Sequence, residues 1–154
     1  MNKIETRLQE LGISLPPAAK PVANYVPWVV SGKFIYIAGQ LPMKEGKPAL
    51  TGAVGAAVTT EDAASAARIA GLNVLSQLRE ACGGDLDRVV RIVKLVGFVN
   101  CGPLFTDIPK VVNGASDLMV EVFGDAGKHA RSAVGASSLP LGASVEIEAV
   151  VEIA

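Results

Sequence analysis

The sequence predicts an α+β fold in which a mixed sheet carries two long helices on one face. Segments with the β-branched content of strands alternate with two long amphipathic stretches, and after a short first helix their order is β-β-α-β-α-β-β. A chain of 154 residues without a break in composition fits a single core. The second face of the sheet has no helix assigned to it, so we expect the protein to cover that face by self-association.

The first half of the chain supplies a short helix, a hairpin and the first long helix. Ile4, Leu8 and Leu11 lie at helical spacing before Gly12, which predicts a helix over residues 3–11. The prolines that follow force an extended connector. The other elements expected here are strands over 25–30 and 33–38 joined at Ser31-Gly32, an irregular stretch over 39–58, and a helix over 60–82 with a threonine as its N-cap.

The second half supplies the centre of the sheet. Residues 89–99, VVRIVKLVGFV, are the most strand-like run and predict a central strand. A helix is expected over 108–123, where Asn113-Gly114 lowers helix propensity and indicates either a break or a functional contact. Two strands are expected at 131–135 and 144–153. Because the SSLPLGA connection between them is short, we expect them to be antiparallel neighbours.

Composition excludes several classes of function. Half of the residues are hydrophobic and the mean hydropathy is +0.40, which favours an oligomer. The net charge of −1 lacks the basic excess that binding to a phosphate backbone needs, so nucleic acid is not expected as the main partner. With His129 as the single histidine and no CxxC spacing, we expect no metal site, and without a glycine-rich phosphate loop we expect no nucleotide cofactor.

The N-terminal segment and the cysteines bear on location. MNKIETRLQELG is charged and amphipathic, so it fits neither a signal peptide nor a membrane anchor. Cys82 and Cys101 show no pairing pattern. Cys101 is expected to be an inert thiol, since no activating group lies near it in sequence. Together these features favour a reducing cytoplasm and no membrane partner.

Arg131 is the residue that most needs an explanation. Its guanidinium stays charged at any working pH, yet it is flanked by small residues at 130 and 132–136. Strand alternation places Glu146, Glu148 and Glu152 on one face of the last strand, so an ion pair within the chain is one possible partner for Arg131. The small residues leave space beside the guanidinium, so the carboxylate of a small molecule is the other possible partner.

Three stretches resemble one known family. HARSAVGASSLPLGASVEIEA, NYVPWVVSGKFIYIAGQLP and VVRIVKLVGFVN resemble the signature regions of the RidA/YjgF family, also described as L-PSP endoribonucleases. The resemblance runs from about Pro21 to the end and is greatest for a subgroup with an added N-terminal helix. It implies an N-terminal helix and connector over 1–20 and a RidA/YjgF-like domain over 21–154.

The resemblance carries expectations about fold and function. It implies a chorismate-mutase-like fold and a homotrimer with clefts between subunits. The implied activity is hydrolytic deamination of reactive 2-imino acids and their enamine tautomers to 2-keto acids and ammonia, without a cofactor. Arg131 would hold the substrate carboxylate and Glu146 would orient the attacking water. The substrate-binding positions implied are Tyr25, Ala38, Gly39, Arg131 and Ala133.

Three departures from the family pattern leave alternatives open. Ala38 and Ala133 stand where better-known members carry a small hydroxyl or thiol, and Pro103 stands where many carry asparagine. The site is therefore less polar than the family pattern, which leaves room for a bulkier imino acid or for a non-catalytic module that binds a small carboxylate. Ribonuclease activity fits an acidic chain poorly, although a trimer would bring together basic residues: Arg91, Lys94 and Lys110.

Overall fold

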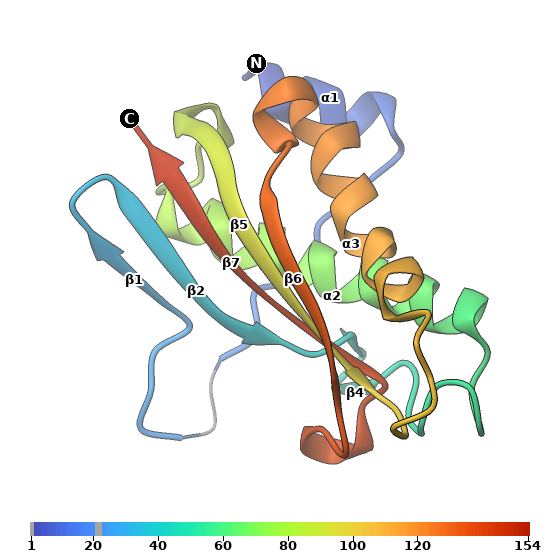
Figure 1. Cartoon of the computed structure of the whole chain (residues 1–154). Coiled ribbons are helices and arrows are strands. Elements are labelled where there is room, and N and C mark those ends of the chain that lie inside the picture. Colours follow the sequence, from blue (N-terminus) through green and yellow to red (C-terminus); the bar gives the residue numbers. More distant parts are fainter. Residues whose placement is uncertain (1, 21–22) are drawn as a thin grey trace.

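The computed structural model describes residues 2–20 and 23–154, and it has one main sheet (Figure 1). Five strands are ordered β1-β2-β7-β5-β6, and two short strands form a separate hairpin. Among the described strands of this sheet, β5 and β6 pair in parallel and the other pairs are antiparallel, so the sheet is mixed. The strands are β1 (Trp28–Ser31), β2 (Phe34–Gln40), β3 (Met43–Lys44), β4 (Lys47–Pro48), β5 (Val89–Asn100), β6 (Ala130–Ala136) and β7 (Val145–Ile153).

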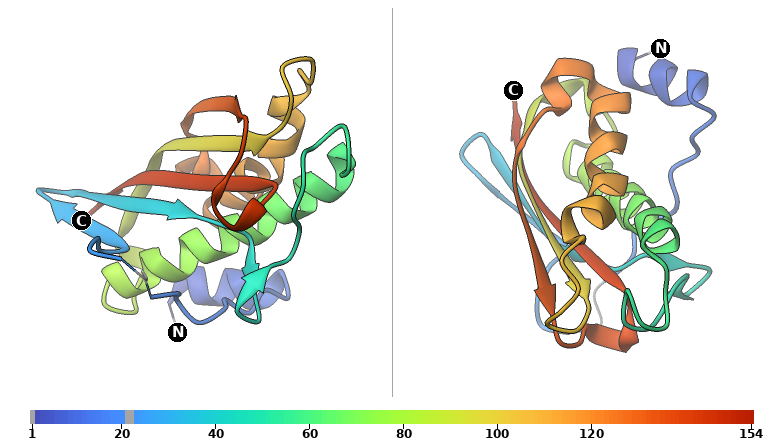
Figure 2. Two further views of the ribbon diagram at one scale, coloured as in Figure 1. Left: turned by 90° about the horizontal axis from the view of Figure 1, so that it is seen from below. Right: turned by 45° about the vertical axis from the view of Figure 1, so that its right-hand side comes forward.

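The two long helices cover one face of the sheet, as predicted. They are α2 (Thr60–Ala81) and α3 (Ile108–Phe123), and Figure 2 shows both on the same side of the strands. The Thr59 hydroxyl caps α2 by accepting a hydrogen bond from the Asp62 amide (3.1 Å). Short 3-10 segments complete the chain: η1 (Leu86–Arg88), η2 (Gly124–Gly127) and η3 (Pro140–Gly142). The α+β fold class is confirmed.

The helix α3 runs without a break through Asn113-Gly114. A β-carbon at Gly114 would overlap the backbone carbonyl of Ala64 in α2, so glycine is what allows the two helices to touch here. The first half of α2, which is rich in alanine, therefore approaches α3 closely at this point. Of the two alternatives that the sequence left open at this dipeptide, the break is wrong.

The hairpin at the start of the sheet is shorter than predicted. The first strand begins at Trp28, and Ser31 pairs with Phe34, so the two turn residues are Gly32 and Lys33. The turn shifts by one position because Gly32 takes a φ of +61°, which glycine adopts without steric cost. The stretch after β2 is irregular as expected, apart from the small β3–β4 hairpin.

The prediction that the last two strands are neighbours is wrong. Strand β5 lies between β6 and β7, pairing with β6 in parallel and with β7 in antiparallel register. The connection over 137–144 is long enough to pass one strand, and the apolar run of β5 is best buried in the middle of the sheet. This order leaves β6 as an edge strand, which decides where Arg131 lies.

The N-terminal helix α1 (Lys3–Glu10) packs against its own chain. The Asp87 carboxylate accepts hydrogen bonds from the backbone amides of Lys3 and Ile4, each at 2.8 Å. These hydrogen bonds lower the pKa of Asp87 below its ordinary value, because they favour the charged form. The expected boundary between the segment 1–20 and the rest falls at Pro21, which is outside the described residues.

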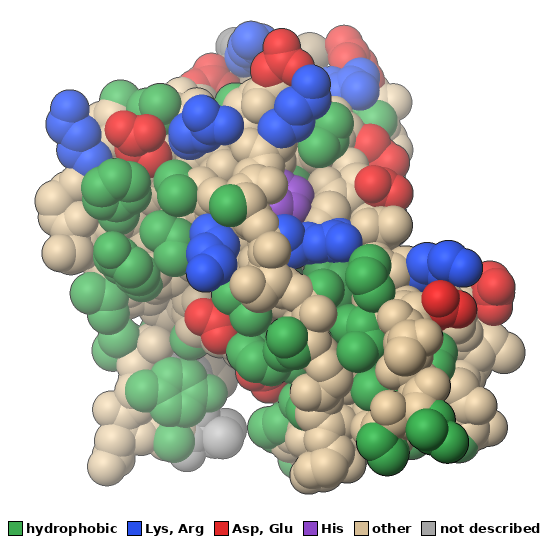
Figure 3. All heavy atoms as spheres, in the orientation of Figure 1, with side chains coloured by type: hydrophobic (Ala, Val, Ile, Leu, Met, Phe, Trp, Pro, Cys, Tyr) green, Lys and Arg blue, Asp and Glu red, His purple; other side chains and the backbone are tan. Residues whose placement is uncertain are grey.

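No described helix covers the other face of the sheet. Figure 3 shows hydrophobic side chains grouped over β1 and β2 on this face. Val29, Phe34 and Tyr36 are exposed there, and Val134 is exposed near the opposite edge. None of the helices in the described part of the chain combines the length and apolar character that a bilayer span needs.

Candidate functional site

Arg131 lies on the edge strand β6 and points toward α3. It pairs in register with Leu95, a fully buried residue on the helix-covered face, so its side chain leaves the sheet on that face. Its Nη1 donates hydrogen bonds to Asn113 Oδ1 (2.7 Å) and Ser116 Oγ (3.1 Å). Both partners are neutral. Within the described residues, no carboxylate lies within ion-pair distance of Arg131.

His129 is hydrogen-bonded to Ser116, which in turn accepts a hydrogen bond from Arg131. Its Nδ1 lies 2.7 Å from the carbonyl oxygen of Gly127, which only accepts, so Nδ1 carries the hydrogen. In the neutral ring, Nε2 then accepts from the Ser116 hydroxyl at 2.9 Å. Hydrogen bonds therefore run from Gly127 through His129 and Ser116 to Arg131, and they fix the direction of the guanidinium while its charge stays unneutralised.

Glu146 lies on the opposite, uncovered face of the sheet. It pairs with Phe98, three residues from Leu95 along β5, and an odd separation places the two on opposite faces. A β-carbon at Gly39 would overlap the Glu146 carboxylate, so Gly39 leaves the space that this side chain occupies. Burial raises the pKa of Glu146 above its ordinary value of 4.5, and the neighbouring charge of Glu148 raises it further.

We predict a pH-dependent stability effect at Glu146. Because its pKa is raised in the folded chain, the folded state binds this proton more tightly, so the contribution to stability is full below 4.5 and falls as pH rises through the raised pKa. Glu146→Gln is therefore expected to raise the urea midpoint at neutral pH and to lose that gain below pH 4.5. The same gain at both pH values would contradict this.

Glu148→Gln provides a matched comparison for that experiment. It removes the like charge but leaves the burial, which is the larger cause of the raised pKa. In the Glu148→Gln background, the effect of Glu146→Gln is expected to shrink without vanishing.

Tyr25 and Gly39 line one small cavity of about 190 Å³. Tyr25 is exposed. Ala38, beside Gly39, accepts a hydrogen bond through its backbone oxygen from the Gln40 side chain (3.0 Å). Other lining residues are Ala19, Lys20, Pro27, Leu41, Met43 and Leu141.

The expected site residues therefore form two groups on one chain. We call Tyr25, Ala38, Gly39 and Glu146 the glutamate half-site, and Arg131 with Ala133 the arginine half-site. Ala133 pairs with Gly97 and so shares the face of Arg131. Strand β5 and the thickness of the sheet separate the two half-sites. The ion pair between Arg131 and Glu146 or Glu148, one partner that the sequence left open, does not form in the described chain.

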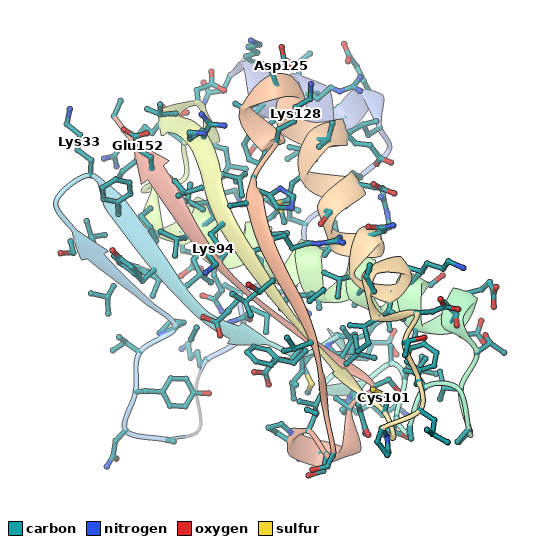
Figure 4. All side chains as sticks on the ribbon, viewed as in Figure 1. Lys33, Lys94, Cys101, Asp125, Lys128 and Glu152 are labelled. Carbon is teal, nitrogen blue, oxygen red and sulfur yellow. The ribbon has the colours of Figure 1, made fainter. Side chains whose placement is uncertain are left out.

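The sequence did not identify Asn113, Ser116 and His129 as partners of Arg131. One signal was available, because asparagine followed by glycine inside a helix is costly and indicates a contact that compensates. Figure 4 places Cys101 near the end of β5, where it is buried, and it shows Lys94 on the uncovered face. No three His, Cys, Asp or Glu residues in the described ranges gather closely enough to hold a metal ion.

The fold and the match to a family of known sequences define the class to which this chain belongs. The sequence profile described as "YjgF/chorismate_mutase-like, putative endoribonuclease" matches residues 5–153. The chain belongs to this family, as the sequence resemblance indicated. The residues implied by that resemblance, Arg131 and Glu146, both lie within the matched range.

Individual relatives agree with the family assignment. Protein TCP17 of Trypanosoma cruzi is 49% identical over 152 residues, which cover 98% of this chain and 94% of TCP17. The crystal structure of Atu1372 from Agrobacterium tumefaciens is 50% identical, with a TM-score of 0.91 over 98% of this chain and 92% of that one. Escherichia coli TdcF, solved with bound serine, shares the fold at 22% identity, with a TM-score of 0.65 over 89% and 94% of the two chains.

Proposed function

We propose that this protein hydrolyses 2-imino acids and their enamine tautomers to 2-keto acids and ammonia, in clefts between the subunits of a homotrimer. One observation carries the proposal: Arg131 presents a positive charge at a sheet edge, and its hydrogen-bond partners among the described residues are two neutral oxygens. The guanidinium has five N–H donors, and Nη1 supplies those that reach Asn113 and Ser116. The donors on Nη2 and Nε suit a planar carboxylate.

A homotrimer is part of the proposal, because each chain carries the two half-sites on opposite faces of its sheet. The apolar residues Val29, Phe34 and Tyr36 on the uncovered face favour burial against another copy. A neighbouring chain that covers this face would bring its arginine half-site to the glutamate half-site. A cytoplasmic location, where Cys82 and Cys101 stay reduced, also belongs to this proposal.

The reaction needs little from the protein. The protonated imine carbon is already electrophilic, so the site has to anchor the carboxylate and place a water on that carbon. The water oxygen bonds to the imine carbon, and its proton passes by way of Glu146 to the nitrogen. The C–N bond then breaks with its electron pair going to nitrogen, and the remaining hydroxyl proton passes to the departing ammonia, so the iminium and water have become a 2-keto acid and an ammonium ion. A carboxyl group with a raised pKa suits this proton transfer.

The substrate is expected to carry an apolar side chain. Ala38 and Ala133 replace polar groups of the family pattern, and Leu141, which lines the same cavity as Tyr25, is exposed. Polar substrates such as those derived from serine would find fewer partners here. The serine bound to TdcF is a small molecule with a carboxylate. TdcF resembles this chain in its fold.

The test of this function is a turnover assay. Iminobutanoate is generated in place by a threonine dehydratase, and semicarbazone formation reports how much imine survives. We expect the protein to suppress semicarbazone formation in proportion to its concentration. If the imine decays at the uncatalysed rate although the protein binds 2-ketobutanoate, the protein is a small-carboxylate binding module. Salt-sensitive RNA cleavage in the same preparation would favour the endoribonuclease description.

A further inference from the structure

A second cavity lies beside the cavity of Tyr25, between the N-terminal connector, the β3–β4 hairpin and α2. Its volume is about 640 Å³, within the range of small-molecule sites. Most of its lining is apolar, and Ile69 and Leu72 of α2 belong to that lining. The other lining residues are Ser14, Pro16, Pro17, Ala18, Ala19, Met43, Lys44, Glu45, Gly46 and Asn73.

Three buried polar side chains of α2 anchor the walls of this cavity to the helix. The Ser76 hydroxyl donates to the Pro16 carbonyl oxygen (2.7 Å), and Gln77 Nε2 donates to that of Ala19 (2.7 Å). Asn73 Nδ2 donates to two carbonyl oxygens at the start of the hairpin, those of Leu41 (3.0 Å) and Met43 (3.1 Å). The connector and the hairpin are each anchored to the helix, so the space between them is built into the fold.

Asn73 also offers an unused acceptor at the cavity. The residue is only 5% exposed, and its two donor bonds fix which atom is nitrogen. Its Oδ1 accepts no hydrogen bond from any described residue. Asn73 lines this cavity, so Oδ1 is the acceptor that its side chain has left for an occupant.

The rim of the cavity favours a neutral ligand. Lys44 and Glu45 are adjacent and opposite in charge, and neither belongs to an ion pair within the described residues. None of the other lining residues in the described part of the chain has an ionisable side chain. A ligand with a net charge would therefore gain little here and would lose its hydration on entering.

We propose that this cavity binds a small neutral molecule with an apolar body and one N–H or O–H group that donates to Asn73 Oδ1. Neither Arg131 nor Glu146 lines this cavity, so a failed test of one proposal does not contradict the other. It shares Ala19 and Met43 with the cavity of Tyr25, so an occupant would contact one wall of the glutamate half-site.

Indole and 1-methylindole test this proposal as a matched pair of probes. The two share an aromatic body, but only indole has an N–H donor. Titration of the full chain, followed by amide NMR shifts of residues 69–73, is expected to give an indole Kd of about 1 mM or tighter. We expect 1-methylindole to bind about five- to ten-fold more weakly, since it leaves Asn73 Oδ1 without a partner. Equal affinities, or no indole binding, would overturn the proposal.

A cavity-filling variant locates the binding. Ile69→Trp is expected to abolish the binding of both probes, whereas Leu104→Trp, which adds the same side chain on an exposed loop, is expected to leave it unchanged. Indole shifts that persist in Ile69→Trp would place the site elsewhere and refute the proposal. The comparison of the two probes on the unmodified chain remains decisive if Ile69→Trp does not fold.

Discussion

Arg131→Met is expected to lower kcat/KM for iminobutanoate hydrolysis by on the order of 10²- to 10³-fold while the trimer stays folded. Methionine keeps much of the length of the side chain but removes the charge and the donors that would hold the carboxylate, and charge-assisted bidentate bonds are among the strongest a site offers. Initial rates in the semicarbazone assay give the change, and circular dichroism checks the fold. Unimpaired turnover by this variant would remove Arg131 from the site.

Arg68→Met is the matched control for that experiment. Arg68 forms a surface ion pair with Glu121 (2.9 Å) on the outer side of the helix layer, and such pairs contribute little. The same substitution there is expected to leave kcat/KM within about two-fold of the unmodified protein. The difference in kcat/KM between the two variants shows how much of the loss is specific to Arg131 as the group that would hold the substrate carboxylate.

Mixing two inactive variants tests whether the site lies between subunits. Arg131→Met chains keep an intact glutamate half-site, and Glu146→Gln chains keep an intact arginine half-site. In trimers assembled from an equal mixture, about a quarter of the clefts contain both intact half-sites, so activity is expected to return to roughly that fraction. If the site were built within one chain, no mixed trimer would regain activity.

Gly114→Ala is expected to destabilise the protein by roughly 2–4 kcal/mol, although alanine favours helix by about 1 kcal/mol. The added β-carbon would overlap the Ala64 carbonyl oxygen, which belongs to the backbone of α2 and has no rotamer that moves it away. The two helices must therefore separate along their contact. Urea denaturation measures the loss, and greater stability than that of the unmodified chain would contradict the close contact.

The control for Gly114 is a glycine in open space. Gly102 lies in the loop after β5, and a β-carbon there would meet no atom within 4 Å. Gly102→Ala is expected to change the free energy of unfolding by less than about 1 kcal/mol. A similar loss at both positions would mean that the effect does not come from the contact between α2 and α3.

Much of the fold follows from the sequence, because local patterns carry it. The Thr cap and the apolar stripe of residues 60–82 predicted α2 to within one residue at its end. The apolar run at 89–99 predicted a central strand, and β5 is central. These predictions succeed because hydrophobic periodicity and helix capping depend on residues that are close together in the sequence.

The position of the last two strands did not follow from the sequence. A short connection favours pairing between strands that follow each other in the chain. Here the order was determined instead by β5, which lies between β6 and β7 with both of its edges paired. The local pattern of β6 and β7 contains no information about which strand lies between them. The ion pair of Arg131 with Glu146 or Glu148 within one chain, one of the two partners that the sequence left open, does not form in the described chain for this reason.

The sequence by itself determined that the permanently charged side chain of Arg131 is flanked by small residues, since the identity and order of residues are fixed in the covalent chain. Only the tertiary structure decided what meets that charge, because Asn113 and Ser116 lie 18 and 15 residues away in the chain and reach it through the packing of α3 on the sheet. The same holds for Glu146, whose neighbour Gly39 comes from a distant strand. Contacts between distant segments depend on how whole elements pack, and local patterns do not specify that packing.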